Sequence, residues 1–109
     1  MANAFKNYTR QSIGTSANSV YNPTTSGMQS TIIGMSIANI GGTPISVNVF
    51  LNDSSANTYL IRNALIPVGG TLIPIGGDQK LVMEQNDTLY VSSNTSSSAD
   101  VILSVLEIG

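Results

Sequence analysis

The sequence predicts an all-β fold, a single-domain antiparallel β-sandwich of the Ig-like or jelly-roll-like kind with about seven or eight strands. Between residues 30 and 108, short runs of Ile, Val and Leu are separated by clusters of Gly, Pro, Asn, Asp or Ser. Within the runs, apolar and polar residues alternate with a period of two, which is the period of a half-buried strand. The 109 residues fit one domain, because by size scaling such a chain buries about 65% of its unfolded surface.

Residues 1–29 differ in character from the rest and are interpreted as an N-terminal arm with a possible edge strand, followed by a β-sandwich domain over residues 30–109. The arm is rich in Asn, Ser and Thr. The apolar pair 20–21 comes just before Pro23, which cannot donate to a ladder, so the pair predicts a short strand that ends in a turn. Two uses of the arm stay open: packing on its own core, which is commoner, and addition of a strand to a neighbour's sheet edge.

The stretch 31–39 is predicted to be a strand with one core-facing side. Its alternation places Ile33, Met35 and Ile37 on that side and Ile32 on the other. This strand therefore supplies the first residues of the predicted core.

Residues 45–52 form the clearest half-buried strand, because apolar and polar residues alternate at its start. The preceding segment 40–44 contains two glycines, which take positive φ without penalty, and it is predicted to be a hairpin connection. The segment 53–57 consists mainly of Asp, Ser and Asn and is predicted to be a turn.

The remaining strands show the same pattern of apolar runs ended by turn residues. They are predicted at residues 58–66, 71–75, 80–84, 88–93 and 99–107. Pro74 lies inside one of these runs, which indicates a sheet edge or a bulge. The positions that alternate toward the interior form the predicted core. They are Ile33, Met35, Ile37, Val47, Val49, Leu60, Leu81, Leu89, Val91, Val101, Leu103 and Val105.

Two kinds of turn were weighed as ligand sites. Asp53, Ser54 and Asn57 offer oxygen ligands, but calcium takes six to eight oxygens and usually several carboxylates. Turn chemistry is the preferred interpretation, because these residue types bond to nearby backbone groups. The glycine pairs at 69–70 and 76–77 are not followed by Gly-Lys-Ser or Gly-Lys-Thr or by a predicted helix, so nucleotide binding is not expected.

The composition argues against an enzyme. The sequence contains no His and no Cys, which excludes His-dependent triads, thiol nucleophiles and ordinary zinc sites. It has no Gly-x-Ser-x-Gly elbow, and with no Trp it lacks the best aromatic platform for a glycosidase cleft. No catalytic, cofactor-binding or metal-ligating residue is therefore predicted, and no cofactor or small-molecule substrate is expected.

The low charge points to protein partners. Charged residues make up 9% of the chain, compared with about 25% in ordinary proteins. Hydroxyl and amide groups are less costly to desolvate than ions, so such a surface suits permanent packing in an assembly. Lys6 and Arg10 are too few for a nucleic-acid footprint, and no apolar run is long enough for a membrane-spanning helix. We therefore expect partners among proteins, including copies of this chain. We expect neither a nucleic-acid partner nor a membrane partner.

Three motifs occur in a fixed order in the second half of the chain. They are Pro-Val-Gly-Gly at 67–70, Lys-Leu-Val-Met-Glu at 80–84 with Asn-Asp at 86–87, and a closing segment from Ser-Ala-Asp to Leu-Glu at 98–107. In this order the motifs resemble small virion structural proteins of tailed bacteriophages, especially of marine myoviruses, over roughly residues 33–107. The family commonly has Gly-Asp where this chain has Asn86-Asp87, a change compatible with the same turn.

The resemblance implies a non-enzymatic structural subunit of a tailed-phage virion, such as a capsid decoration, neck or tail accessory protein. Such a subunit would contact other virion proteins and copies of itself, and would be found in the virion after synthesis in the host cytoplasm. The motifs determine turns and core strands and assign no functional residue. Two alternatives stay open: a receptor- or carbohydrate-binding module at a fibre tip, and a bacterial β domain without a role in a virion.

Overall fold

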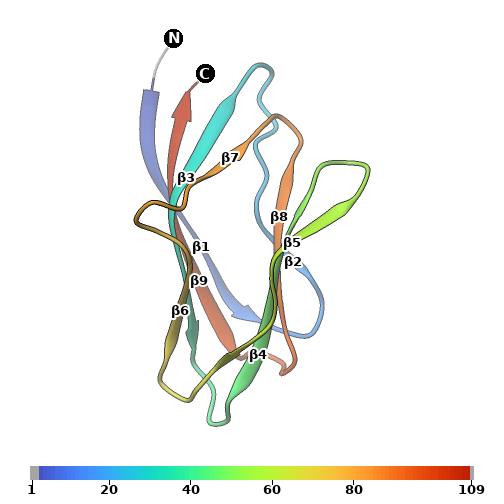
Figure 1. Cartoon of the computed structure of the whole chain (residues 1–109), viewed down its shortest axis with the longest axis vertical. Coiled ribbons are helices and arrows are strands. Elements are labelled where there is room, and N and C mark those ends of the chain that lie inside the picture. The colour runs from blue at the N-terminus through green and yellow to red at the C-terminus, as the bar shows by residue number, and fades with distance from the viewer. Residues whose placement is uncertain (1–2, 109) are drawn as a thin grey trace.

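The computed structural model describes residues 3–108 as two antiparallel β-sheets that pack face to face (Figure 1). Nine strands follow one another along these residues, compared with the seven or eight expected. They are β1 (Asn3–Ile13), β2 (Asn18–Tyr21), β3 (Gln29–Asn39), β4 (Ile45–Asn52), β5 (Asn57–Ile66), β6 (Thr71–Ile75), β7 (Leu81–Met83), β8 (Thr88–Ser93) and β9 (Ala99–Ile108). No helix that could cross a membrane occurs in the described part of the chain.

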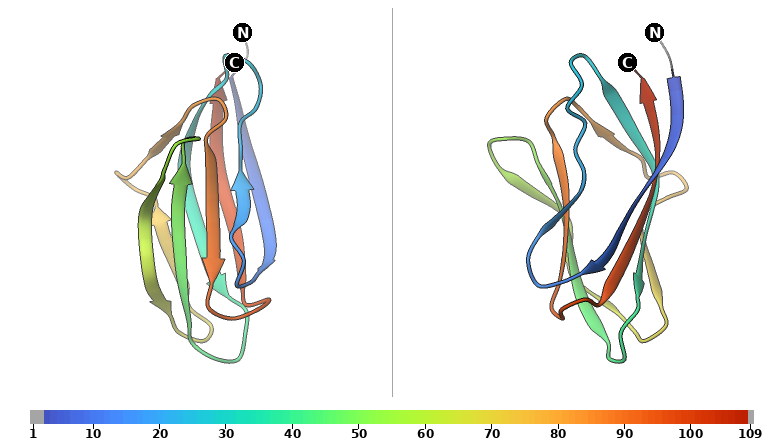
Figure 2. Two further views of the ribbon diagram at one scale, coloured as in Figure 1. Left: turned by 90° about the vertical axis from the view of Figure 1, so that its right-hand side faces the viewer. Right: turned by 180° about the vertical axis from the view of Figure 1, so that it is seen from behind.

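The strands pair as they would in one long hairpin that is folded over on itself. Starting from the tip at β4 and β5, β3 pairs with β6 and β7, β2 with β8, and β1 with β9. The pairing of β9 with β3 completes sheet A, which has the order β1-β9-β3-β6, with β7 also paired to β3. The pairing of β8 with β4 completes sheet B, which has the order β2-β8-β4-β5. This is the arrangement of a jelly roll, so the predicted all-β sandwich is confirmed in its jelly-roll form. Figure 2 shows the two layers from the side and from behind.

The strands of the N-terminal arm lie at sheet edges of their own chain. β1 is the edge strand of sheet A and runs along β9 from the pair Asn3 and Ile108 onward. β2 is the edge strand of sheet B and pairs with β8. In Figure 1 the start of β1 and the end of β9 lie side by side at one end of the sandwich.

Most of the predicted core is buried between the sheets. The predictions are confirmed for Met35, Ile37, Val47, Val49, Leu89, Val91, Val101, Leu103 and Val105. Leu60 and Leu81 are partly buried and pack against this core. The structure adds fully buried residues that were not predicted, among them Ile13, Ile45, Ile66, Ile75 and Met83.

The prediction for Ile33 is wrong, because β3 contains a bulge. Ile32 pairs with Val105 and Gly34 pairs with Ser104, so β3 has one residue more than β9 at this point. An extra residue shifts the alternation by one. As a result Ile32 is fully buried, whereas Ile33 faces outward and is only partly covered.

The segment 40–44 is not a hairpin connection, as the sequence suggested, but crosses from sheet A to sheet B. β3 and β4 lie in different sheets, and neither glycine of this segment has a positive φ. The segment is held by the buried side chain of Asn39. Its Nδ2 donates to the carbonyl of Thr43 at 2.9 Å and to that of Ile66 at 3.1 Å, and its Oδ1 accepts from the Gly41 amide at 2.9 Å.

Pro74 predicted either a sheet edge or a bulge, and the structure confirms both. β6 lies at the edge of sheet A. Its pairing with β3 shifts register between Leu72 and Ile75, the interval that contains Pro74. A proline is tolerated there because no regular ladder hydrogen bond is required of it.

Candidate functional site

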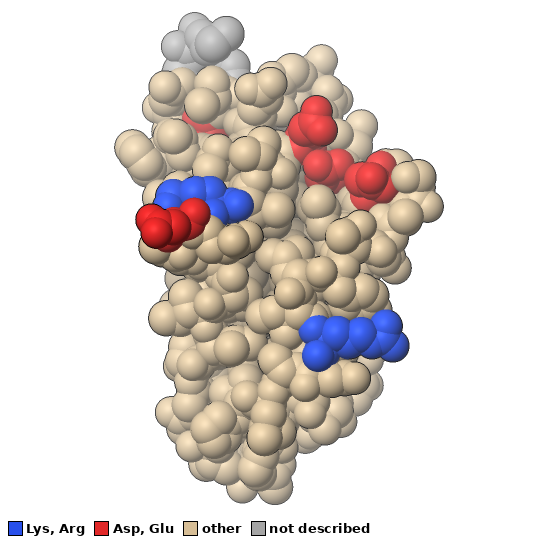
Figure 3. All heavy atoms as spheres, viewed as in Figure 1, with Lys and Arg blue, Asp and Glu red and all other residues tan. Residues whose placement is uncertain are grey.

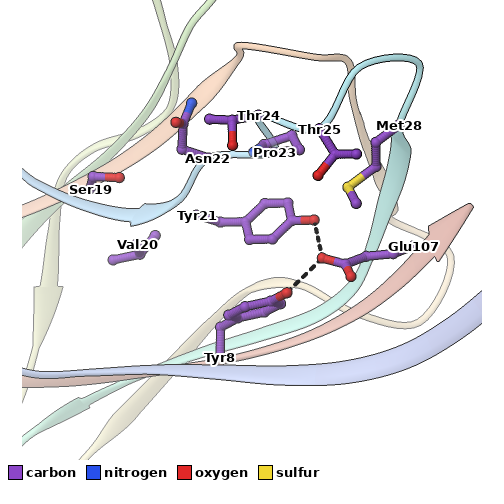
Figure 4. A pocket seen from close by; sticks show the side chains of 10 residues that line it. All are labelled: Tyr8, Ser19, Val20, Tyr21, Asn22, Pro23, Thr24, Thr25, Met28 and Glu107. Carbon is purple, nitrogen blue, oxygen red and sulfur yellow. Dashed lines mark hydrogen bonds between the residues drawn. The ribbon is translucent and has the colours of Figure 1, made fainter. Parts of the chain in front are cut away.

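A pocket of about 450 Å³ opens between the two edge strands of the N-terminal arm and the segment that follows β2 (Figure 4). Tyr8 of β1, Tyr21 of β2 and Glu107 of β9 form its inner part. The other lining residues are Ser19, Val20, Asn22, Pro23, Thr24, Thr25 and Met28. The pocket therefore combines two aromatic rings and one carboxylate with small polar side chains.

Glu107 is held by two phenol groups. The hydroxyl of Tyr8 donates to Glu107 Oε2 at 2.6 Å, and the hydroxyl of Tyr21 donates to the same oxygen at 2.7 Å. Figure 4 shows the two rings reaching this oxygen from different sides. Tyr21 Oη also lies 2.7 Å from Ser30 Oγ. Because the single proton of Tyr21 is directed to Glu107, the Ser30 hydroxyl is the donor in that bond.

These bonds hold the tyrosines in their neutral, protonated form. Burial, the hydrogen bond to Glu107 and the negative charge of that residue, in this order of size, together raise the pKa of Tyr8 to about 12. Burial also raises the pKa of Tyr21. The hydrogen bond from Ser30 lowers this pKa, and the hydrogen bond to Glu107 raises it. Distances of 2.6 and 2.7 Å are those of charge-assisted O–H···O⁻ bonds, so the geometry is that of an ionised carboxylate.

Sequence reasoning did not identify this cluster, although the sequence contains a signal for it. In β9 the side chains of Val101, Leu103 and Val105 alternate into the core, and Glu107 occupies the next core-facing position. A carboxylate at such a position requires polar partners. Its partners are the tyrosines of the distant N-terminal arm, and the spacing of residues along the chain does not reveal which ones.

Of the residues considered as calcium ligands, Asp53 and Ser54 lie in the turn between β4 and β5, and Asn57 is the first residue of β5. Asp53 Oδ1 accepts from the Ser55 hydroxyl at 2.9 Å and from the amides of Ser55 and Ala56, both at 3.1 Å. These hydrogen bonds lower the pKa of Asp53, and the bond from the Ser55 side chain has the largest effect. Gly69 and Gly77 have φ values of +74° and +58°, which the turns after β5 and β6 require. Residues 3–108 contain no group of three or more metal-ligating side chains.

The outer face of sheet A carries no charged side chain over four successive rows of paired residues. The rows consist of Asn3, Ile108 and Gln29; Phe5, Leu106, Thr31 and Val82; Asn7, Ser104 and Gly34; and Thr9, Ile102 and Ser36. Phe5 is 77% exposed and Val82 is 63% exposed. Ile33, turned outward by the bulge, lines a shallow hollow together with Phe5, Asn7 and, at the edge of the sheet, Lys6. In the view of Figure 3 the acidic side chains lie in the upper half, basic side chains lie at the upper left and at the right below the middle, and the lowest part shows no charge.

The outer face of sheet B carries a row of three aromatic residues. Phe50 pairs with Tyr90 on one side and with Tyr59 on the other. The ring centroids of Phe50 and Tyr90 are 5.1 Å apart with planes 21° from parallel, and Phe50 and Tyr59 are also 5.1 Å apart. The guanidinium carbon of Arg62 lies 5.1 Å from the ring centroid of Tyr59. These rings therefore use much of their surface on one another.

No protein-family model and no curated protein sequence matches this chain. Among solved structures, the chain is similar to one described by the words "Bacillus endospore appendages form a novel family of disulfide-linked pili". The TM-score is 0.57 and the identity 11%, over 96% of this chain and 86% of that chain. At this identity the likeness concerns the fold alone, because unrelated functions share such folds.

Proposed function

We propose that this protein is a non-enzymatic structural subunit of a larger protein assembly and, in keeping with the resemblance of residues 33–107, of a tailed-phage virion. It acts through contacts with copies of itself and with other proteins of the particle. The observation that carries the proposal is the uncharged outer face of sheet A, with the exposed Phe5 and Val82 in one row.

This face has the chemistry of a surface that is covered in an assembly. The four rows contain no charged residue that would have to be desolvated, and apolar area contributes about 25 cal/mol for each Å² removed from water. The chain measures 45 × 27 × 23 Å, so a broad face exceeds the roughly 800 Å² per partner of a standard interface.

The fold is compatible with this role, and this support is by analogy. Jelly rolls occur in viral capsid proteins as well as in lectins and enzymes. The similar endospore appendage protein belongs to disulfide-linked pili by its description. This chain contains no cysteine, so contacts between its copies would be non-covalent.

The contact between copies is tested by placing a charge on the face. Phe5→Asp buries a carboxylate in the proposed interface and is expected to weaken self-association at least about tenfold, because an unpaired buried charge is costly. Leu65→Asp is the matched control, since Leu65 is 69% exposed but lies on β5 of sheet B. Light scattering of the purified proteins over a range of concentrations measures the mass. A wild-type protein that stays monomeric, or equal effects of the two substitutions, would contradict an interface between copies on this face.

Location in a virion is tested separately by mass spectrometry of purified particles. Detection in particles at a constant number of copies per particle supports the virion proposal. A protein that is produced in the host but absent from the particles favours the alternative of a bacterial β domain.

A second candidate, a receptor- or carbohydrate-binding module, is supported by the aromatic row of sheet B. Tyr59 is 43% exposed, and tyrosines stack on sugar rings. Against it, the rings already contact one another and Arg62 covers part of Tyr59. A glycan array decides: this candidate requires a bound glycan whose signal is lost in Tyr59→Ala and kept in Phe5→Asp.

A further inference from the structure

We infer that the pocket around Glu107 is a binding site for an alkylammonium group, the chemistry of a lysine side chain or of a free aliphatic amine. The inference holds whether or not the chain assembles through sheet A. It is carried by three observations on the described part of the chain. A nine-tenths buried carboxylate has no cation bound to it there, one of its oxygens has no hydrogen-bond partner among residues 3–108, and aromatic rings lie beside it.

The carboxylate is not neutralised by a cation of the described chain. Glu107 is 9% exposed, and its side-chain partners among residues 3–108 are the two phenols. Three basic side chains are engaged elsewhere. Arg10 donates to Asn18 Oδ1, Arg62 lies over Tyr59, and Lys80 donates to the carbonyl of Gly77.

Lys6 is the remaining basic side chain of residues 3–108 and lies closer to the pocket in the sequence of β1. It lies two residues before Tyr8 and therefore on the same side of β1. The side chain is exposed, and Lys6 does not line this pocket. An exposed ammonium group keeps its water shell and neutralises a buried carboxylate only weakly.

The position of the second carboxylate oxygen makes the site available. Both phenols donate to Oε2, and no hydrogen bond from residues 3–108 ends on Oε1. Because no buried side-chain oxygen or nitrogen among residues 3–108 lacks a partner, Oε1 is open to the pocket that Glu107 lines. A donor that enters the pocket therefore finds an unoccupied charged acceptor.

The rings of the pocket favour a cationic donor over a neutral one. The ring centroids of Tyr8 and Tyr21 are 4.9 Å apart with planes at 54°, so two tilted rings lie against each other beside the carboxylate. Aromatic faces attract ammonium groups, most strongly where water is excluded. The phenols spread the negative charge of Glu107 but do not cancel it, and an ammonium group would. A neutral polyol would gain only hydrogen bonds.

The test is a titration followed by NMR of the isotope-labelled protein with n-butylammonium chloride, and with n-butanol and glucose as neutral probes. The ammonium probe is expected to shift signals of Tyr8, Tyr21 and Glu107 at lower concentration than either neutral probe. Glu107→Gln keeps the shape and removes the charge, so it should weaken ammonium binding at least about tenfold. Glu84→Gln is the matched control, because it removes the same charge from an exposed position and should leave binding unchanged.

Two further variants keep the test decisive if Glu107→Gln fails to fold. Tyr8→Phe removes one donor from the carboxylate, and Lys6→Met removes the cation on the same side of β1. Both should bind n-butylammonium at least as tightly as the wild type. Loss of binding in both, equal binding of butanol, preferential binding of glucose, or no shift with any probe would overturn the inference. Titration with Nα-acetyl-lysine methylamide and with putrescine then distinguishes a lysine side chain from a free amine.

Discussion

Ile32→Ala is expected to lower the unfolding free energy by about 2–5 kcal/mol, whereas Ile33→Ala, one residue further on, is expected to lower it by about 1 kcal/mol or less. Ile32 is fully buried between the sheets, so truncation leaves a cavity there. Ile33 is turned outward by the bulge in β3 and is only partly covered. Urea unfolding of the two variants, followed by circular dichroism, measures the difference.

This pair of neighbours tests the register of sheet A directly. Without the bulge, strict alternation would reverse the order of the two effects. Ile37→Ala serves as a positive control, since Ile37 is fully buried beyond the bulge. If Ile33→Ala lowered the unfolding free energy more than Ile32→Ala, this result would contradict the bulge in β3.

Unfolding free energy is also expected to fall as the pH rises from about 10 to above 12. An unfolded tyrosine loses its proton near pH 10, whereas Tyr8 holds its proton to about pH 12 and the pKa of Tyr21 is raised as well. Below pH 10 both states keep these protons, so the stabilisation is fully present. Above it the unfolded chain binds fewer protons than the folded protein, and stability decreases until the folded tyrosines ionise.

The size of this effect follows from the shift in pKa. For Tyr8, a rise from 10.0 to about 12 corresponds to at most about 3 kcal/mol, and solvent screening at this partly exposed side chain reduces that figure. Urea midpoints between pH 9 and 12 measure the slope for the wild type and for Tyr8→Phe combined with Tyr21→Phe. The double variant should show a flatter slope, and parallel curves would contradict the role of the cluster.

The fold could be predicted to the extent that strands keep strict alternation. From Val101 to Val105, and from Ile45 to Val49, every second residue is buried as the pattern requires. The prediction failed where the backbone departs from that pattern, as at Ile33, because nothing in the residues before Gly34 marks an inserted residue. It also failed at the segment 40–44, since a glycine-rich connection has the same composition whether it joins two strands of one sheet or crosses between sheets.

The candidate site could not be predicted, for a different reason. Tyr8 and Tyr21 stand out in the arm as isolated aromatic residues, and Glu107 stands out as a charge at a core-facing position. What brings them together is the placement of both edge strands beside β9. Glu107 lies 99 residues from Tyr8 and 86 from Tyr21 in the chain, so only the three-dimensional arrangement joins them.

The pairing of β1 with β9 also has a consequence for the order of folding. During synthesis, β1 leaves the ribosome first and has no partner strand in sheet A until β9 has followed it. β9 also lies between β1 and β3, so sheet A cannot become continuous earlier. Such non-local pairing carries a high entropy of loop closure and is typical of slow folding. A nascent chain that has reached β8 would therefore expose unpaired strands of sheet A, and β9 completes that sheet.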